Sequence, residues 1–367
     1  MTSLPANESA FADQACELVD DVVRSCPAHR AGTRPIHAPG IAAHGWFSAT
    51  PVASTYTTAA HFSGRRIPVT VRFSNGTGDS DEPDGTPQVR GMAVKFHLGA
   101  VSHDEWGVLH SEDETDLIGM TMPMFFARDV ADFRAFVAAA RPVPAAKRSW
   151  RQKMLEKLRL ETPFPAVAPG ELSNEPGVFE YASRHPEACP AAVFLGAKFV
   201  PESYTTCCYH MVHAFAISAP YGSRRWARFH WEPVDGVRSA SPEACRLPGP
   251  GERFLRDGLK DQIVNGRAEF VLRMDLAEEG DDPTDPTRPW SQRRPRVAVG
   301  HLRLTDVPED QWHGGELLSF NPTRLVPGIG LSCDPTLNIR GEVYRVSSAR
   351  RLQVAQPPPG SSNSART

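Results

Sequence analysis

Hydrophobic and polar positions follow two different periods along the first half of the chain. Residues 9–26 place apolar side chains at helical spacing, which predicts an N-terminal helix. Residues 67–74 and 89–98 alternate instead, as neighbouring β-strands do when a polar, glycine-rich loop joins them. The helical period returns in residues 129–140 and in the basic, amphipathic residues 145–160. The first half therefore mixes helices with extended segments.

Alternation dominates the second half of the chain. It recurs in residues 210–217, 226–231, 269–276 and 296–304, which proline-rich or acidic loops separate. Such spacing is typical of an antiparallel β-barrel. Residues 355–367 are rich in Pro, Gly, Ser and Asn, so they are predicted to form a disordered tail.

Length and composition limit the organisation and the partners of the chain. Its 367 residues could hold two average domains, but a large barrel with insertions often takes this length as one. We therefore expect a single domain over residues 1–354, with the barrel mainly in 27–304 and a connection and final helix in 305–354. The net charge of −3 and the lack of a basic stripe argue against nucleic acid as a partner.

The sequence shows no targeting signal and no cysteine motif. Its start has neither basic residues nor an apolar core, and no apolar run reaches the ~18 residues of a membrane span. The seven cysteines are scattered and include no Cys-x-x-Cys pair, which predicts reduced thiols. Together these features predict a cytoplasmic protein.

The final predicted helix carries the most specific chemistry. Arg340 and Tyr344 stand four residues apart, so on a helix the guanidinium lies against the phenol oxygen. A cation at that place favours the phenolate, and a tyrosine phenolate is a rare ligand of haem iron. The same pair taken alone is also typical of an exposed helix surface, so the rest of the chain has to decide between the two interpretations.

The chain resembles the catalase family in four segments that follow one another in the family's order. They span residues 34–352, which is most of the chain. A full-length catalase continues with a wrapping segment and a helical domain, so the resemblance is to the small catalase-related peroxidase branch. The matching segments are Arg34-Pro-Ile-His37-Ala-Pro-Gly40, Val71-Arg72-Phe73-Ser74-Asn75-Gly76 with Val89-Arg90-Gly91-Met92-Ala93-Val94-Lys95-Phe96, Asp116-Leu-Ile-Gly119 with Pro123-Met-Phe125-Phe126-Ala-Arg128-Asp129, and Asp334-Pro-Thr-Leu-Asn-Ile-Arg340-Gly-Glu-Val-Tyr344 with Arg350-Arg351.

This resemblance implies the fold, the cofactor and the ligand of the iron. It implies an α+β protein with a catalase-like antiparallel β-barrel, surrounding helices and a C-terminal helix that binds haem b. Tyr344 would be the axial ligand, Arg340 would keep it deprotonated, and His213 and Asp334 would extend this relay. By itself, His213 is also compatible with a buried core histidine.

The resemblance also implies an acid-base group on the opposite side of the haem. His37 matches the family's distal histidine, and an imidazole with an ordinary pKa of about 6.5 is mostly neutral at pH 7. Ser74 would form a hydrogen bond with the His37 ring. His44 and His61 are nearby rivals, of which His44 falls where the family carries an aromatic residue.

Further residues are implied to contact the haem itself. Arg34, Arg72 and Arg351 match basic residues that bind the haem propionates, a task that suits the planar guanidinium fork. Phe126 and Phe133 would pack on the porphyrin, although aromatic core residues need no cofactor to explain them.

One departure from the family pattern bears on the reaction. After Asp116-Leu-Ile-Gly119 the family has two asparagines, the second of which hydrogen-bonds peroxide, whereas this chain has Met120, Thr121 and Met122. Thr121 offers one hydroxyl donor with a shorter reach. Oxidisable methionines beside haem suit rapid dismutation of hydrogen peroxide poorly, and their apolar side chains suit an organic substrate.

The sequence therefore favours a haem enzyme that uses hydrogen peroxide or an organic hydroperoxide to oxidise a small organic co-substrate. Within the same class, the alternatives are an enzyme that rearranges fatty-acid hydroperoxides, as allene oxide synthases do, a biosynthetic tailoring oxidase, and a weak true catalase. The alternative from another class is a haem sensor or storage protein. A supported distal base argues against the last. A homo-oligomer is also compatible with the sequence.

Overall fold

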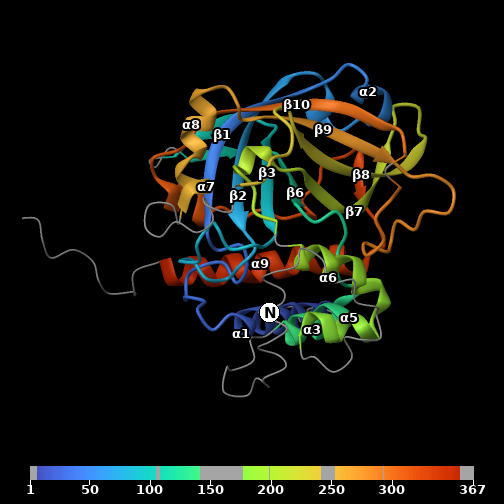
Figure 1. The fold of residues 1–367 in the computed structure, drawn as a ribbon. Coiled ribbons are helices and arrows are strands. Elements are labelled where there is room, and N and C mark those ends of the chain that lie inside the picture. Colours follow the sequence, from blue (N-terminus) through green and yellow to red (C-terminus); the bar gives the residue numbers. More distant parts are fainter. Residues whose placement is uncertain are drawn as a thin grey trace, which may run out of the picture.

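The fold is an antiparallel barrel with helices packed beneath it. The computed structural model describes residues 6–104, 108–140, 177–197, 199–240, 253–291 and 293–355. The barrel strands are β1 (Gly40–Ala49), β2 (Arg66–Asn75), β3 (Arg90–His97), β6 (Glu114–Met120), β7 (Tyr209–Ser218), β8 (Arg224–Pro233), β9 (Glu269–Leu276) and β10 (Arg296–Asp306). They pair in the order β6-β3-β2-β1-β10-β9-β8-β7, and β7 also pairs with β6, which closes the barrel (Figure 1). The α+β barrel predicted from the sequence is confirmed.

The remaining described elements are helices and short pieces that connect or cover these strands. They are α1 (Ala6–Ser25), α2 (Ala53–Tyr56), η1 (Ala60–Phe62), β4 (Val101–His103), β5 (Leu109–Ser111), α3 (Val130–Ala139), α5 (Val178–Arg184), η3 (Pro186–Ala188), α6 (Cys189–Gly196), η4 (Tyr204–Thr206), α7 (Phe254–Asp257), α8 (Leu259–Val264), η7 (Trp312–Glu316), β11 (Ile329–Leu331) and α9 (Pro335–Ala355).

Alternation along the strands divides their side chains between the barrel core and its outer face. In β3, Met92, Val94 and Phe96 are buried in the main hydrophobic core, whereas Gly91 and Ala93 border a cavity outside the barrel. The side chains of β3 are therefore apolar on the inner face and small on the outer face, where another group must approach. This small-residue surface faces the helical layer.

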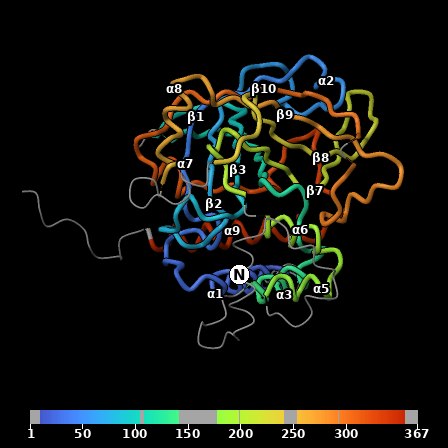
Figure 2. Tube along the Cα trace, viewed as in Figure 1, coloured from blue at the N-terminus to red at the C-terminus, as the bar shows by residue number. Residues whose placement is uncertain are grey.

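Helix α9 lies between the barrel and the outer helices α1 and α3 (Figures 1 and 2). Leu18 and Val19 of α1 pack with Ile339 and Val346 of α9, and their helical spacing places them on facing stripes. This contact buries one side of α9. The side chains on its other side are left to face the barrel.

The start of α9 is fixed by Asp334, which is fully buried. Its Oδ1 accepts hydrogen bonds from the backbone N–H groups of Thr336 at 2.9 Å and Leu337 at 3.2 Å. Pro335 follows at the first helical position, where its missing N–H costs no hydrogen bond. The cap therefore sets where the helix begins and which residues face the barrel.

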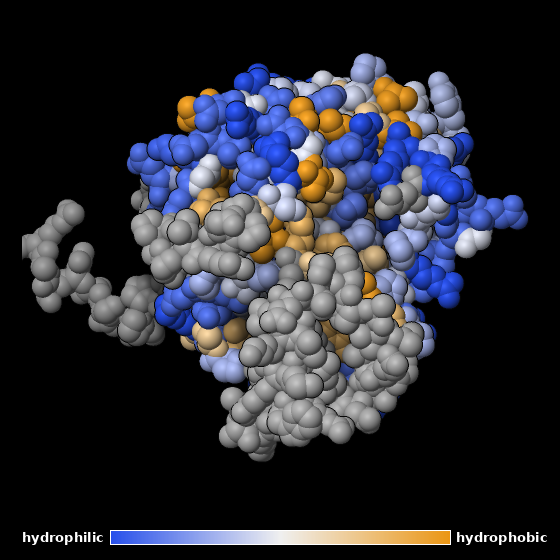
Figure 3. All heavy atoms as spheres, in the orientation of Figure 1, coloured by the Kyte–Doolittle hydropathy of each residue, from blue (hydrophilic) through white to orange (hydrophobic). Residues whose placement is uncertain are grey.

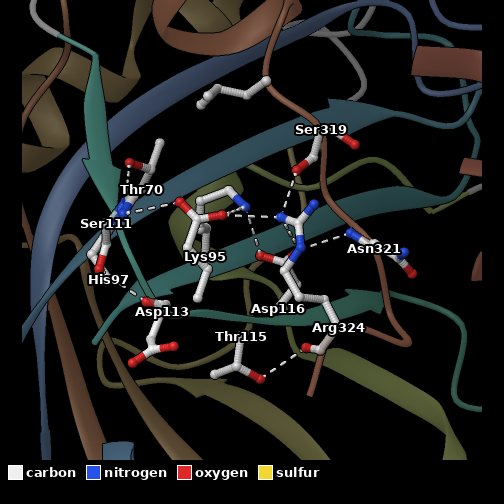
Figure 4. Close-up of polar contacts among 12 residues, drawn as sticks. Thr70, Lys95, His97, Ser111, Asp113, Thr115, Asp116, Ser319, Asn321 and Arg324 are labelled. Carbon is white, nitrogen blue, oxygen red and sulfur yellow. Dashed lines mark hydrogen bonds and ion pairs between the residues drawn. The ribbon is translucent and has the colours of Figure 1, made fainter. Parts of the chain in front are cut away.

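The segment before α9 is tied to the barrel by a buried carboxylate. Asp116 Oδ2 accepts from the Asn321 backbone N–H at 2.8 Å and from Arg324 Nη1 at 3.0 Å, while its Oδ1 lies 3.2 Å from Lys95 Nζ (Figure 4). Burial raises the pKa of Asp116 in spite of these cations. The network joins β3 and β6 to the chain that leads into α9.

Most of the predicted elements are present. The helices expected over 9–26 and 129–140 are α1 and α3, and the six predicted barrel strands all form. Strands β1 and β6 and the helices between residues 178 and 196 were not predicted. The helix expected over 145–160 lies outside the described residues, as does the expected tail after Ala355, which ends α9.

The outer surface is largely polar on the face that Figure 3 shows, with apolar residues gathered toward the centre. In the described part of the chain, no helix is long and apolar enough to cross a membrane. The six cysteines among the described residues are all unpaired, as expected for reduced thiols.

Candidate functional site

A single large cavity of about 870 Å³ separates the barrel from the helical layer within the described residues. Its walls come from β2 and β3 on one side and from α9, α1 and α3 on the other. Pockets of about 300–1,000 Å³ are typical of sites that enclose a cofactor or ligand. The residues expected to carry the chemistry can therefore be placed relative to this cavity.

On the α9 wall, Arg340 and Tyr344 both line the cavity. Arg340 Nη2 donates to Tyr344 Oη at 2.9 Å, and the helical spacing of four residues brings the two groups together. The phenol oxygen thus meets a cationic donor at the edge of an enclosed space. An anionic oxygen ligand of a metal would need such a partner.

Behind this wall, His213 and Asp334 form a buried pair outside the cavity lining. His213 Nδ1 lies 2.6 Å from Asp334 Oδ2, and His213 Nε2 is buried with no hydrogen-bond partner. Burial lowers the pKa of His213, Asp334 opposes this shift, and the charge of Arg340 adds to it. The pair therefore acts electrostatically on Arg340 from behind.

On the opposite wall, His37 and Ser74 face the same cavity. Ser74 Oγ lies 3.0 Å from His37 Nδ1. A Cβ atom added at Gly91 would lie 2.7 Å from Ser74 Oγ and 2.9 Å from His37 Nδ1, so only glycine fits beneath this pair. The strand register that pairs Ser74 with Gly91 therefore sets the position of the imidazole.

The environment keeps His37 neutral. Burial, followed by the charges of Arg72, Arg340 and Arg34, lowers its pKa to about 3. The imidazole is thus unprotonated at neutral pH, and a smaller fraction of it carries a proton than its ordinary pKa would give.

Neither rival histidine lines the cavity. His44 pairs with Asp306 at 3.0 Å, and His61 lies in the barrel interior against Phe62.

Three arginines expected to contact the cofactor also line the cavity. They are Arg34, Arg72 and Arg351. The Nε atoms of Arg72 and Arg351 are buried without a hydrogen-bond partner, which in a closed site calls for an anionic acceptor. Such unpartnered guanidinium donors fit the carboxylates of a haem.

Glu316 was missed by the sequence analysis. Its carboxylate bridges two of these arginines, with Oε1 2.5 Å from Arg72 Nη2 and Oε2 3.0 Å from Arg34 Nη1. Burial would raise the pKa of Glu316, but Arg72 and Arg34 outweigh burial and lower it. No motif marks this residue, since its partners lie more than 240 positions away along the chain.

The two predicted aromatic residues line the cavity, whereas the threonine that departs from the family pattern does not. Phe126 and Phe133 line the cavity and stack with ring centroids 5.0 Å apart. Thr121 is not among the lining residues, and its Oγ1 accepts from the Arg90 backbone N–H at 3.1 Å, whereas its neighbours Met120 and Met122 do line the cavity. The expected position of Thr121 above the cofactor is thus not favoured by this geometry, because the hydroxyl of this residue, which follows β6, bonds to the first residue of β3.

The residues present fit a haem. An apolar cavity holds a phenol with a cationic partner on one wall, a neutral imidazole on the other, and unpartnered arginine donors between them. These groups suit, in turn, an axial oxygen ligand, a distal base and anionic propionates.

Comparisons with known proteins identify one family. A model of the catalase family matches residues 14–162 and 165–356. A catalase-related peroxidase of Mycolicibacterium paratuberculosis is 32% identical over 343 residues, which cover 92% of this chain and 96% of that protein. A catalase-related peroxidase of Synechococcus elongatus is 27% identical over 88% of this chain and 84% of its own length. Catalase-2 of Bacillus subtilis is 27% identical over 89% of this chain, which spans 45% of that longer protein.

Proposed function

The chain belongs to the catalase family and is a haem-dependent oxidoreductase, and from that premise we propose that it is a peroxidase. In this proposal, hydrogen peroxide or an organic hydroperoxide is reduced while a small organic co-substrate is oxidised, with haem b bound through Tyr344. The observation that carries it is the pair of facing walls, Arg340 with Tyr344 and His37 with Ser74, across one apolar cavity.

His37 performs the proton transfer in this proposal. Haem iron supplies, when bound, the two-electron oxidation that accompanies cleavage of the peroxide O–O bond. Nε2 of His37 takes the proton from the near oxygen of peroxide and returns it to the leaving oxygen, while Ser74 holds the ring by Nδ1. The lowered pKa of His37 keeps the imidazole unprotonated before peroxide enters.

Tyr344 would hold the haem iron in this proposal. Arg340 donates to its oxygen and so favours the anionic form that binds iron. Asp334 orients His213 by a hydrogen bond, and the charge of Arg340 acts on this buried pair. Arg72 and Arg351 direct their unpartnered Nε donors to the propionates, and Arg34 contributes positive charge beside them.

The lining of the cavity supports an organic co-substrate. Met120, Met122 and Leu195 give it an apolar side, and position 121 carries a hydroxyl that does not line the cavity instead of an amide that could hold hydrogen peroxide. The match over nearly the full length of a protein named catalase-related peroxidase agrees with this choice. Dismutation of hydrogen peroxide is accordingly expected to be the weaker activity.

Rearrangement of a fatty-acid hydroperoxide is the second candidate, because the same apolar lining could hold a hydrocarbon chain. Asp79, Asp81 and Glu82 also line the cavity, and although Asp81 is paired with Arg30, the other two carboxylates would repel the carboxylate of a fatty acid. A neutral or cationic organic substrate therefore fits better.

Product analysis of the haem-loaded protein tests the proposal. Three reactions are compared at equal haem content: hydrogen peroxide alone, hydrogen peroxide with a dye reductant, and a polyunsaturated fatty-acid hydroperoxide. We expect dye oxidation to exceed oxygen release. Oxygen release as the dominant reaction would establish a catalase instead, and an isomerised lipid as the main product would establish the rearranging activity.

A further inference from the structure

The backbone at His37 is strained. It is the only residue other than glycine with a positive φ in the described part of the chain, at 60°. Side chains with a Cβ atom rarely adopt this left-handed conformation, and it persists only where surrounding contacts enforce it. The position of the imidazole therefore depends on whatever holds the carbonyl groups around it.

Arg72 holds those carbonyl groups. Its Nη1 donates to the His37 carbonyl at 2.9 Å and its Nη2 donates to the Ala38 carbonyl at 2.9 Å, so the guanidinium bridges two successive peptides. A Cβ atom added at Gly40 would lie 2.6 Å from this guanidinium, which shows how closely the chain wraps it. Arg72 is itself only 4% exposed.

Glu316 in turn fixes Arg72. One carboxylate oxygen accepts from Arg72 Nη2 at 2.5 Å and the other from Arg34 Nη1 at 3.0 Å. Arg34 also donates to three backbone carbonyls around Glu316, those of Gly315, Glu316 and Leu318, at 2.7–3.1 Å. Arg34 therefore anchors Glu316, and the carboxylate is held rigidly against Arg72.

We propose that Glu316 is a positioning residue for the distal base: through Arg72 it holds the strained His37 backbone and thereby aims the imidazole into the cavity. The inference rests on the proposed role of His37. It also gives Arg72 two tasks, because both Nη atoms donate to the protein while the buried Nε has no partner and would serve a propionate. Glu316 itself contacts neither peroxide nor co-substrate in this account.

Hydrogen exchange in the full-length, haem-loaded protein tests the proposal without relying on activity. Glu316→Gln removes the charge but keeps the shape, and Glu316→Asp keeps the charge on a shorter side chain. We expect the peptide covering residues 35–42 to exchange about tenfold faster in Glu316→Gln, the effect of losing one charge-assisted hydrogen bond, and to recover partly in Glu316→Asp. The Ala38 amide, which donates to Thr77, reports this opening directly.

Glu114→Gln is the matched control. Glu114 also bridges two cations, Lys95 at 2.7 Å and Arg324 at 3.1 Å, and its side-chain exposure of 21% is close to the 24% of Glu316. It ties β6 to the segment before α9 but does not touch Arg72. Unchanged exchange over residues 35–42 in Glu316→Gln, or an equal rise in Glu114→Gln, would overturn the proposal. The same comparison in the haem-free chain decides the matter if Glu316→Gln loads haem poorly.

The rate of reaction with peroxide separates this inference from the function on which it rests. Glu316→Gln should react about tenfold more slowly than the wild type, and His37→Ala more slowly still. If His37→Ala reacts at the full rate, the proposed role of His37 fails, whatever the exchange result. If His37→Ala reacts slowly and Glu316→Gln reacts at the wild-type rate, the proposed role of His37 is supported and the positioning role of Glu316 is contradicted.

Discussion

The two walls of the cavity are built in different ways. On the α9 wall, Arg340 and Tyr344 belong to one helix, and their hydrogen bond follows from a spacing of four residues. On the barrel wall, His37 comes from an irregular segment, Ser74 from β2, and the glycine beneath them from β3. One wall is local in the sequence and the other is assembled from distant segments.

This difference decides how each wall responds to change. A helix keeps its internal contacts as long as it remains packed, so the α9 wall depends mainly on its own two residues and on the Asp334 cap. The barrel wall depends on strand register, on a strained backbone and on buried ion pairs that hold it. Substitutions far from the barrel wall can therefore alter it, whereas the α9 wall is most sensitive to direct substitution.

The largest effect is expected on the α9 wall. Tyr344→Phe removes the phenol oxygen to which Arg340 donates, so haem affinity should fall by at least about a hundredfold, the upper end of what loss of a partner of a metal ligand costs. Titration of the haem-free protein with haem measures this. Tyr181→Phe is the control, because it removes a buried hydroxyl that bonds to the Asp132 carbonyl outside the cavity. Equal affinities for Tyr344→Phe and wild type would contradict the assignment.

The next effect concerns the barrel wall. His37→Ala should retain haem but react with peroxide about 10² to 10⁴ times more slowly, the usual contribution of a general acid-base group. Stopped-flow mixing with peroxide measures the rate. His44→Ala, which loses only the pair with Asp306, should react at the wild-type rate. If His44→Ala reacted slowly with peroxide and His37→Ala reacted at the wild-type rate, His44 and not His37 would be the acid-base group.

The pH dependence of the peroxide rate tests the same role of His37 on the barrel wall. The pKa of His37 is lowered to about 3, first by burial, so its base form persists and the peroxide rate should stay level from pH 8 to about 4. The free energy of unfolding should nevertheless decline as pH falls below about 6.5. In the unfolded chain His37 and His61 bind protons at that pH, whereas in the folded chain burial keeps both neutral until about pH 3. A rate that drops with a midpoint near 6.5 would show that His37 titrates normally.

The smallest effect is expected at Thr121. Thr121 does not line the cavity, but Met120 and Met122 on either side of it do, and the amide of Thr121→Asn reaches further than the hydroxyl. We therefore expect it to raise oxygen release relative to dye oxidation by at most about tenfold, the value of one hydrogen bond in a dry pocket. Both rates are followed at equal haem content. Thr115→Asn in β6, the strand that ends just before Thr121, is the control, since Thr115 donates to the Arg324 carbonyl away from the cavity. An unaltered ratio in Thr121→Asn would mean that this position does not govern the choice of reaction.

The sequence predicted the barrel and the helix of Tyr344 because each leaves a local or family-level pattern. Strand β6 was missed because its buried Thr115 and Asp116 break the alternation of apolar and polar side chains, and β1 because its glycines and alanines hide it. Glu316 was missed because an ion pair between residues so far apart has no periodicity. The side to which Thr121 points depends on strand pairing with Arg90, which spacing alone does not define. The single domain, the cytoplasmic location and a homo-oligomer stay predictions.

The direct test of the central claim is the resonance Raman spectrum of the ferric, haem-loaded protein. We expect vibrations of an iron-bound phenolate that shift when the protein is made with ring-deuterated tyrosine and that are absent from Tyr344→Phe. Phenolate vibrations that survive unchanged in Tyr344→Phe, or a wild-type spectrum without them, would contradict a haem bound through Tyr344.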